Sequence, residues 1–217
     1  MDAVTELVFI RDILQFIGAF VSLSIAAVSF NGFRQTESPS LLRLSTAFLF
    51  LGFGFLVEGA VGLELATVAL ITTAAVVGLL LQTTGYFFLA FSHAIDVSIS
   101  KRSSVALLVF PLITMSGLEL VAMLSILSFY FVFYGFVETL YSYFRTRRPD
   151  TLLIASGLAL IGSGTFMQWL SSVYLQVSAI SQFLLLGQIL MEEIGLLILF
   201  VPVMTYILSW RKGDGTI

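Results

Sequence analysis

The chain contains no cysteine and only one histidine, His93, among its 217 residues. Without cysteine it can form neither a disulfide nor a thiolate metal site, and a cysteine nucleophile is excluded. A single histidine also excludes bis-histidine haem and the usual polyhistidine zinc or copper centres within the chain. The only histidine base lies near the end of a hydrophobic run, so no catalytic triad is indicated. We therefore predict no enzymatic activity, no cofactor and no metal site.

Charged residues are also scarce, at 11% of the chain, whereas hydrophobic residues make up 59%. The mean hydropathy is +1.05. A chain of this length with so few polar side chains cannot cover a water-soluble globule. Its net charge of −3 gives no indication of nucleic-acid binding. The composition predicts a multi-pass protein of the cell membrane, with the lipid bilayer as its surroundings.

Seven hydrophobic runs are candidates to cross the bilayer, which needs about 20 apolar residues in a helix. They cover residues 8–32, 41–63, 65–95, 104–118, 120–144, 151–174 and 181–210. The fourth run is the weakest, because it is short and contains Pro111, which removes a backbone hydrogen bond. No connection is long enough to fold separately. We predict one all-α transmembrane domain over residues 1–217, a bundle of seven helices.

The cationic residues predict the orientation of this bundle. Nine of the ten lie in alternate connections or just after the last run: Arg34, Arg43, Lys101, Arg102, Arg145, Arg147, Arg148, Arg211 and Lys212. The remaining connections carry Glu64, Glu119 or no charge. By the positive-inside rule, the N-terminus is outside and the C-terminus is cytoplasmic. All the cations share one side only if the fourth run crosses the membrane.

Several residues recur at a separation of 110 or 111 positions. Phe33, Arg34, Leu41, Leu42 and Ser45 recur as Phe144, Arg145, Leu152, Leu153 and Ser156, and Gly52, Gly54 and Gly85 recur as Gly162, Gly164 and Gly195. This pattern indicates a 3+1+3 repeat, in which the fourth run joins two sets of three. A single connecting run leaves both sets in the same orientation, so the repeat is parallel. Chance similarity between hydrophobic helices is the alternative explanation.

Five polar residues within the runs form a candidate intramembrane site: Glu58, Gln82, Gln168, Glu192 and Glu193. The repeat aligns Glu58 with Gln168 and Gln82 with Glu192. A carboxylate in hydrocarbon costs a few kcal/mol, so each acid needs a partner, water or a proton. Neighbours on a helix point about 100° apart, so we expect one of the two adjacent acids to face the bundle axis and favour Glu192. The structural alternative is that protonated acids simply hold helices together through hydrogen bonds.

Three smaller features have local explanations. His93 and Asp96 are three residues apart and share a helical face; we favour an interfacial polar pair over a proton relay or half of a metal site. Arg11 and Asp12 are expected to form an ion pair at the outer interface. Glycines seven residues apart, at 52 and 59 and at 157 and 164, predict close contacts between helices.

Three resemblances concern the architecture. Seven spans with an outer N-terminus are similar to rhodopsins, but the last run has no lysine for a retinal Schiff base. The 3+1+3 plan is similar to sugar transporters of the SWEET type, without their proline-glutamine signature. The segment FRQTESPSLLRLSTAFLFLGFGFLVEG resembles uncharacterised seven-helix membrane proteins of archaea, some of which are sensory input modules. This last resemblance implies a fold and no activity.

Two functions are compatible with the sequence. The first is a non-enzymatic sensory, scaffolding or accessory subunit, with a membrane-protein partner or further copies of the chain around it. The alternative is a small secondary transporter or proton-coupled carrier, with Gln82, Glu192 and Glu193 at a midplane site and Glu58 and Gln168 toward the outer vestibule. A continuous polar cavity between the second, third, sixth and seventh runs would favour the carrier. The carrier hypothesis fails if these groups face one another in a dry, fully packed seam.

Overall fold

The computed structural model describes residues 3–62, 68–91, 117–174 and 179–211, and every element within these ranges is an α-helix. The helices are α1 (Ala3–Thr36), α2 (Pro39–Gly62), α3 (Val68–Phe91), α5 (Gly117–Thr146), α6 (Pro149–Tyr174) and α7 (Ala179–Arg211). All six are long and apolar enough to cross a membrane. The prediction of an all-helical, multi-pass architecture is confirmed for these six spans. The predicted fourth span, 104–118, lies outside the described residues except for its last two, which begin α5.

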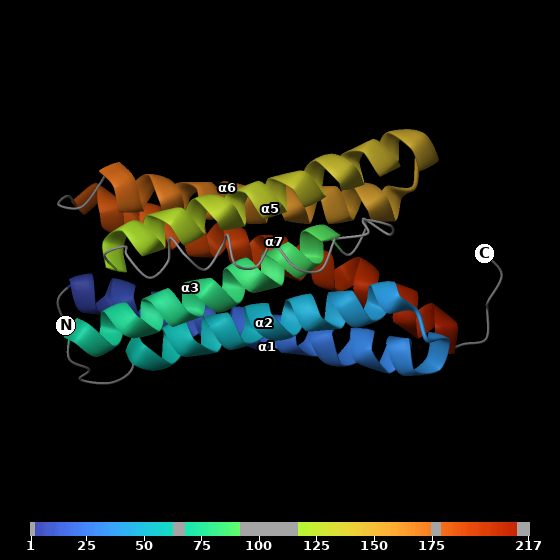
Figure 1. Cartoon of the computed structure of the whole chain (residues 1–217), viewed down its shortest axis with the longest axis horizontal. Coiled ribbons are helices and arrows are strands. Elements are labelled where there is room, and N and C mark those ends of the chain that lie inside the picture. Colours follow the sequence, from blue (N-terminus) through green and yellow to red (C-terminus); the bar gives the residue numbers. More distant parts are fainter. Residues whose placement is uncertain (1–2, 63–67, 92–116, 175–178, 212–217) are drawn as a thin grey trace, which may run out of the picture.

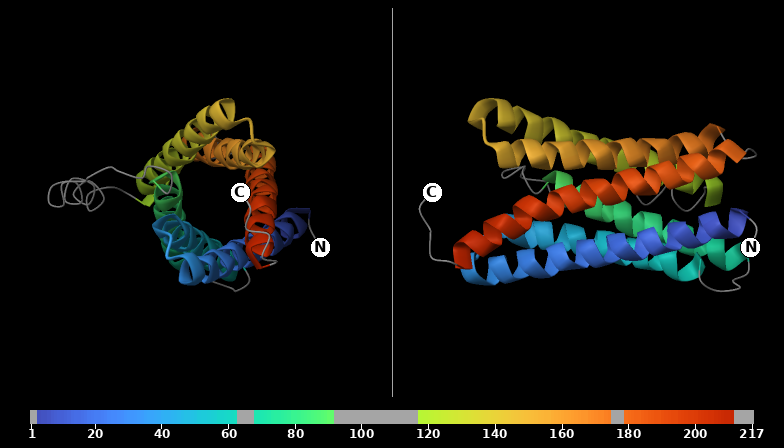
Figure 2. Two further views of the ribbon diagram at one scale, coloured as in Figure 1. Left: turned by 90° about the vertical axis from the view of Figure 1, so that its right-hand side faces the viewer. Right: turned by 180° about the vertical axis from the view of Figure 1, so that it is seen from behind.

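The six helices form a closed ring, seen end-on in Figure 2. Each helix packs against its neighbours along the chain, and the ring closes where α3 meets α5 and where α7 meets α1. Packing is more extensive within α1–α3 and within α5–α7 than between these two sets. We refer to the two sets as the first and second halves, and to the α3/α5 and α1/α7 contacts as the two seams.

The helices alternate in direction within each half. Figure 1 shows α1, α3, α5 and α7 running one way and α2 and α6 running the other. Adjacent helices α3 and α5 are therefore parallel, and the turns of the α1–α2 and α5–α6 hairpins lie at the same end of the ring. The cations of both hairpins are near these turns, with Arg34 in the last turn of α1 and Arg145 in the last turn of α5.

The two hairpin turns have the same geometry at equivalent places of the two halves. Glu37 and Arg147 adopt φ values of 54° and 55°, the left-handed conformation that ends many helices. Each backbone N–H donates a 2.7 Å hydrogen bond four residues back, to the carbonyl oxygens of Phe33 and Tyr143 respectively. Phe33 thus corresponds to Tyr143 in the structure. The predicted match of Phe33 with Phe144, at a separation of 111, is one residue out of register with these turns.

Glycines allow the helices of each half to approach closely, as the sequence predicted. A Cβ added at Gly52 would lie 2.7 Å from Leu23 Cγ on α1, and one added at Gly157 would lie 2.9 Å from the carbonyl oxygen of Gly195 on α7. Such distances leave no room for a side chain. Glu119, predicted to lie in a connection, instead belongs to the first turn of α5, because that helix begins at Gly117.

The interior of the ring is filled by large apolar side chains. Fully buried examples from different helices are Ile25, Phe48, Phe55, Ile161 and Leu196. The outer surface is also apolar, with Phe20, Tyr130, Val201 and many similar side chains exposed. An apolar exterior around an apolar interior is typical of helices that face lipid. Polar groups inside such a ring therefore require an explanation.

Candidate intramembrane polar site

Buried polar side chains from α1, α2, α3 and α7 gather inside the ring. We call this group the acid cluster; it comprises Gln15, Glu58, Gln82, Tyr86, Gln188, Glu192 and Glu193. Glu192 and Glu193 are 2% and 3% exposed, and Gln82 is 2% exposed. The three acids and Tyr86 are close enough to influence one another electrostatically. Four of the five residues predicted for the site thus come together.

Glu58 joins the three helices of the first half. Its Oε2 accepts a 3.0 Å hydrogen bond from Nε2 of Gln15 on α1. Its side chain lies against Gly78 on α3, where a Cβ would collide with the Glu58 Cγ. Gln82, one turn after Gly78, lies beside the same carboxyl group. Glu58 is therefore held by an amide donor on one side and by a glycine that makes room for it on the other.

Glu192 lies against the second helix of its own half. A Cβ added at Gly164 on α6 would lie 2.6 Å from Glu192 Cγ. The first half has the same contact at the equivalent place, where a Cβ at Gly54 on α2 would lie 2.6 Å from Gln82 Cγ. The residues that the sequence aligned, Gln82 and Glu192, thus make corresponding contacts with glycines. Gln188 lies one turn before Glu192 and close to its carboxyl group.

Glu193 faces a different neighbour. A Cβ added at Gly18 on α1 would overlap the Glu193 carboxyl group and lie 2.6 Å from its Cδ. Glu192 and Glu193 are both buried, because α7 packs between α6 and α1 and each acid points toward one of them. The sequence argument that favoured Glu192 over Glu193 as the inward-facing acid is not supported by burial, which is nearly equal for the two.

Many polar atoms of the acid cluster have no hydrogen-bond partner. They are Gln15 Oε1, Gln82 Nε2, Tyr86 Oη, Gln188 Oε1, Glu192 Oε1 and both carboxyl oxygens of Glu193. Buried polar atoms in proteins are nearly always paired, because an unpaired one costs about 1–3 kcal/mol. Such a concentration of unpaired polar atoms marks the acid cluster as the candidate site.

The acids lie close together without forming a metal site. Among the described residues, no three histidine or acidic side chains are grouped closely enough to hold a metal ion. Three carboxyl groups that face one another across a bundle can still exchange protons with water or with each other. The chemistry that this arrangement offers is proton binding.

Arg11 and Asp12 form an ion pair at the opposite end of α1 from the hairpin turn. Arg11 Nη2 lies 2.9 Å from Asp12 Oδ1, which confirms the predicted pair. The Asp12 side chain is 3% exposed and the Arg11 side chain 34% exposed, so the acid is buried and the cation reaches outward. Arg11 is also close enough to act on Glu58. Unlike Arg34 and Arg145 at the hairpin turns, Arg11 is therefore near the acid cluster.

One predicted position, Gln168, does not join the cluster. Gln168 is half-buried on α6, and its described contact is a backbone one, in which its carbonyl oxygen accepts a 2.8 Å hydrogen bond from Ser171. His93 and Asp96 lie outside the described residues. Three members were missed, Gln15, Tyr86 and Gln188. Gln15 and Gln188 could have been predicted, because they are polar residues within apolar runs. Nothing in the sequence distinguishes Tyr86 from the other aromatic residues of the runs.

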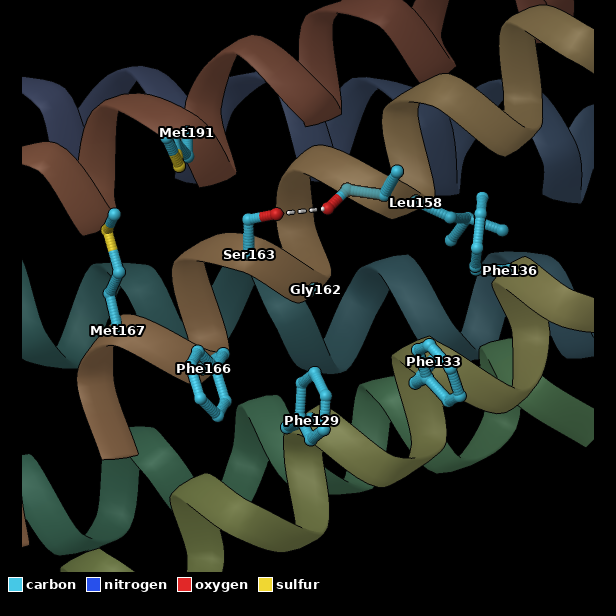
Figure 3. A pocket seen from close by; sticks show the side chains of 10 residues that line it. Phe129, Phe133, Phe136, Leu158, Gly162, Ser163, Phe166, Met167 and Met191 are labelled. Atoms are coloured by element: carbon cyan, nitrogen blue, oxygen red, sulfur yellow. Dashed lines mark hydrogen bonds between the residues drawn. The ribbon is translucent and has the colours of Figure 1, made fainter. Parts of the chain in front are cut away.

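An apolar pocket of about 520 Å³ opens between α5 and α6 (Figure 3). Its lining residues are Phe129, Phe133, Phe136, Leu158, Ala159, Gly162, Ser163, Phe166, Met167 and Met191. The Ser163 hydroxyl donates a 2.9 Å hydrogen bond to the carbonyl oxygen of Ala159, so it is already satisfied. The pocket therefore suits an apolar occupant that forms no hydrogen bonds.

A smaller cavity of about 90 Å³ lies within the ring. Leu44, Phe48, Leu89, Gly135, Ile154, Leu158, Leu199 and Val203 line it. Neither of these two cavities is lined by an acidic residue, so neither leads to the acid cluster. The cluster is enclosed by packed side chains where its contacts are described, most clearly between Glu193 and Gly18.

No family model matches this chain, and no match was found among curated proteins or solved structures. The function is therefore argued from the acid cluster and from the two halves around it.

Proposed function

We propose that the protein is a proton-coupled membrane carrier and that the acid cluster is its proton site, with Glu192 as a principal proton-binding group. The observation that carries this proposal is that Glu192 and Glu193 are buried, with the half-buried Glu58 close to Glu192, inside a ring of candidate membrane spans. Acids within membrane helices are costly and mark proton relays and substrate paths. A purely structural role would leave the carboxyl oxygens hydrogen-bonded, yet Glu192 Oε1 and both carboxyl oxygens of Glu193 have no partner.

The proposal includes seven spans and a parallel repeat, with an outer N-terminus and a cytoplasmic C-terminus. The parallel directions of α3 and α5 support an odd number of crossings between them. The constant separation of 110 supports the repeat, since it relates the turns at Glu37 and Arg147 and the contacts Gly54–Gln82 and Gly164–Glu192. Carriers built from two repeats work by moving one repeat against the other around a fixed site.

The enclosed acid cluster corresponds to an occluded state of such a carrier. Packing within each half exceeds packing between them, which suits two bodies that move relative to each other. The dry contact of Glu193 with Gly18 is the kind of packed seam that counts against a carrier, so the proposal requires this contact to be the closed seam of one conformation only. A protein that kept this seam packed throughout its working cycle would not transport.

The test is Glu192→Gln in proteoliposomes that carry an imposed pH gradient. Wild-type protein should accumulate a small-molecule substrate in response to the gradient, and Glu192→Gln should lose this response while folding normally, because the amide cannot release a proton. Glu138→Gln is the matched control, since Glu138 is an exposed acid on α5. Equal gradient-driven uptake by wild type and Glu192→Gln would remove the proposed role of this acid.

The apolar pocket supports a second candidate, a sensory, scaffolding or accessory subunit that binds a partner in the membrane. Aromatic walls and a small-residue floor at Gly162 offer a place for an apolar helix. Filling the pocket with Gly162→Phe should then remove a partner that co-purifies from native membranes, whereas Ser163→Ala should retain it. If neither wild type nor Ser163→Ala brings a partner with it, the subunit function fails.

A further inference from the structure

The two seams that close the ring differ in their chemistry. At the α3/α5 seam, Thr83 Oγ1 and Ser128 Oγ share a 2.8 Å hydrogen bond, and both residues are buried. Thr83 also donates to the carbonyl oxygen of Leu79 within its own helix. This seam is therefore joined by neutral hydroxyl groups whose charge does not change with pH.

The α1/α7 seam has a carboxyl group at the corresponding place. The repeat relates Thr83 to Glu193 and Gly18 to Ser128. The pair Glu193–Gly18 is thus the counterpart of the pair Thr83–Ser128. Here the glycine offers no side-chain partner, and both carboxyl oxygens of Glu193 lack a hydrogen bond. One seam is closed by a hydrogen bond and the other by an acid packed against a bare backbone.

Only the protonated, neutral carboxyl group of Glu193 is compatible with this packed contact against Gly18. An ionised carboxylate without a donor, in an apolar surrounding, costs several kcal/mol. Ionisation therefore requires water at the seam, and water can reach both oxygens only if α1 and α7 move apart. The proton released from the carboxyl group passes to that water.

The titratable groups around Glu193 strengthen the dependence of its ionisation on water at the seam. Glu192 on α7 and Tyr86 on α3 can only add negative charge near Glu193, and Glu58 on α2 lies close to both of these groups. Helix α1 contributes the Arg11–Asp12 pair at its outer end. The stretch of α6 that packs against α7, from 157 to 165, has no titratable residue. No described cation pairs with Glu193 directly, so a charge on it is best relieved by hydration.

We propose that the α1/α7 seam is the gate to the acid cluster, closed while Glu193 is protonated and opened when it ionises, whereas the α3/α5 seam is the fixed hinge. The inference rests on the proposed carrier function, which requires a route by which water and substrate reach the cluster. It assigns different roles to two contacts that occupy corresponding places in the ring.

The absence of cysteine allows a single reporter at each seam. Ser22→Cys lies on α1 one turn from Gly18, and Val132→Cys is its repeat counterpart on α5; both native side chains are fully buried. The rate of labelling by a membrane-permeant maleimide would be measured in proteoliposomes from acidic to alkaline buffer. Because the thiol itself reacts faster in alkali, each rate is divided by that of the same reporter with Glu193→Gln in the same buffer.

The corrected rate for Ser22→Cys should rise about tenfold between acidic and alkaline buffer, as a sparsely populated open state becomes common. The corrected rate for Val132→Cys should stay constant. A corrected labelling rate at Ser22→Cys that does not change with pH would overturn the gate. An equal rise in the corrected rate at both positions would overturn the assignment of gate and hinge.

A second set of variants does not depend on titration. Gly18→Ala places a methyl group where the Glu193 carboxyl group lies, so it should prop the seam open and speed labelling of Ser22→Cys even in acidic buffer. Adding Glu193→Ala should restore protection. Continued protection in Gly18→Ala, in folded protein, would contradict the contact on which the gate depends.

Labelling requires no substrate, so the gate and the carrier can fail separately. A pH-dependent seam in a protein whose uptake ignores Glu192→Gln would keep the gate and reject the proton-coupled carrier. If the corrected labelling rate does not change with pH, but Glu192→Gln abolishes proton-coupled uptake, the carrier is kept and the gate is rejected.

Discussion

At the scale of single residues, four polar side chains of the acid cluster pack closely against a glycine of a neighbouring helix. Gly164 makes room for Glu192, Gly54 for Gln82, Gly78 for Glu58 and Gly18 for Glu193. Small residues bring helix backbones together in membranes, and here they also fix where a long polar side chain can lie. The glycines therefore position the acids as well as pack the helices.

Gly164→Ala should destabilise the protein by about 1–3 kcal/mol, the usual cost of overpacking. The new Cβ would lie 2.6 Å from Glu192 Cγ and 2.8 Å from the carbonyl oxygen of Gln188, and backbone cannot move aside cheaply. Gly187→Ala is the control, since the nearest atom to its Cβ would be the Met167 sulfur at 4.0 Å. Thermal unfolding in detergent measures both; equal melting temperatures would contradict the close contact at Gly164.

The residues of the cluster differed in how readily the sequence revealed them. Glu58, Glu192 and Glu193 could be predicted because a carboxyl group inside an apolar run is costly and hence conspicuous. That Gln15 donates to Glu58, or that Tyr86 lies among three acids, depends on how each helix is rotated about its axis. The hydrophobic pattern does not determine this rotation when a helix is apolar on all sides.

At the scale of elements, α1, α5 and α7 extend at both ends beyond the apolar runs from which they were predicted. The first run, 8–32, is contained in α1 (Ala3–Thr36), and the run 151–174 begins two residues after α6 does at Pro149. A membrane limits the apolar length but not the helix, which continues into polar residues on both sides. Pro39 and Pro149 could have predicted where α2 and α6 begin, because proline favours the first position of a helix.

Glu37→Gly should stabilise the α1–α2 hairpin by about 1 kcal/mol, because glycine adopts a positive φ without the steric cost of a Cβ. Glu37→Ala is the matched control: it removes the same charge but keeps the Cβ at a φ of 54°. Unfolding in denaturant should rank Glu37→Gly above both wild type and Glu37→Ala. If Glu37→Ala were as stable as Glu37→Gly, the gain would come from the lost charge and not from the backbone.

At the scale of the whole molecule, two halves of similar plan produce a ring whose seams are chemically unequal. Thr83 and Ser128 join one seam, and Glu193 lies unpaired in the other. A symmetric ring would open equally at both seams or at neither. Under the proposed gate, this difference gives the molecule one seam that responds to protons.

The orientation of the ring can be tested with single cysteines at its two ends. Glu37→Cys and Asp150→Cys place thiols at the two hairpin turns without removing a cation, and Gly62→Cys places one at the far end of α2. Because both turns share the basic end, a membrane-impermeant maleimide should label Glu37→Cys and Asp150→Cys only after the cells are permeabilised. Gly62→Cys, the control on the same helix as the first turn, should react in intact cells. Labelling of the two turns from opposite sides of the membrane would contradict the parallel arrangement of the halves. Labelling of both turns in intact cells would reverse the predicted orientation while leaving the ring arrangement unchanged.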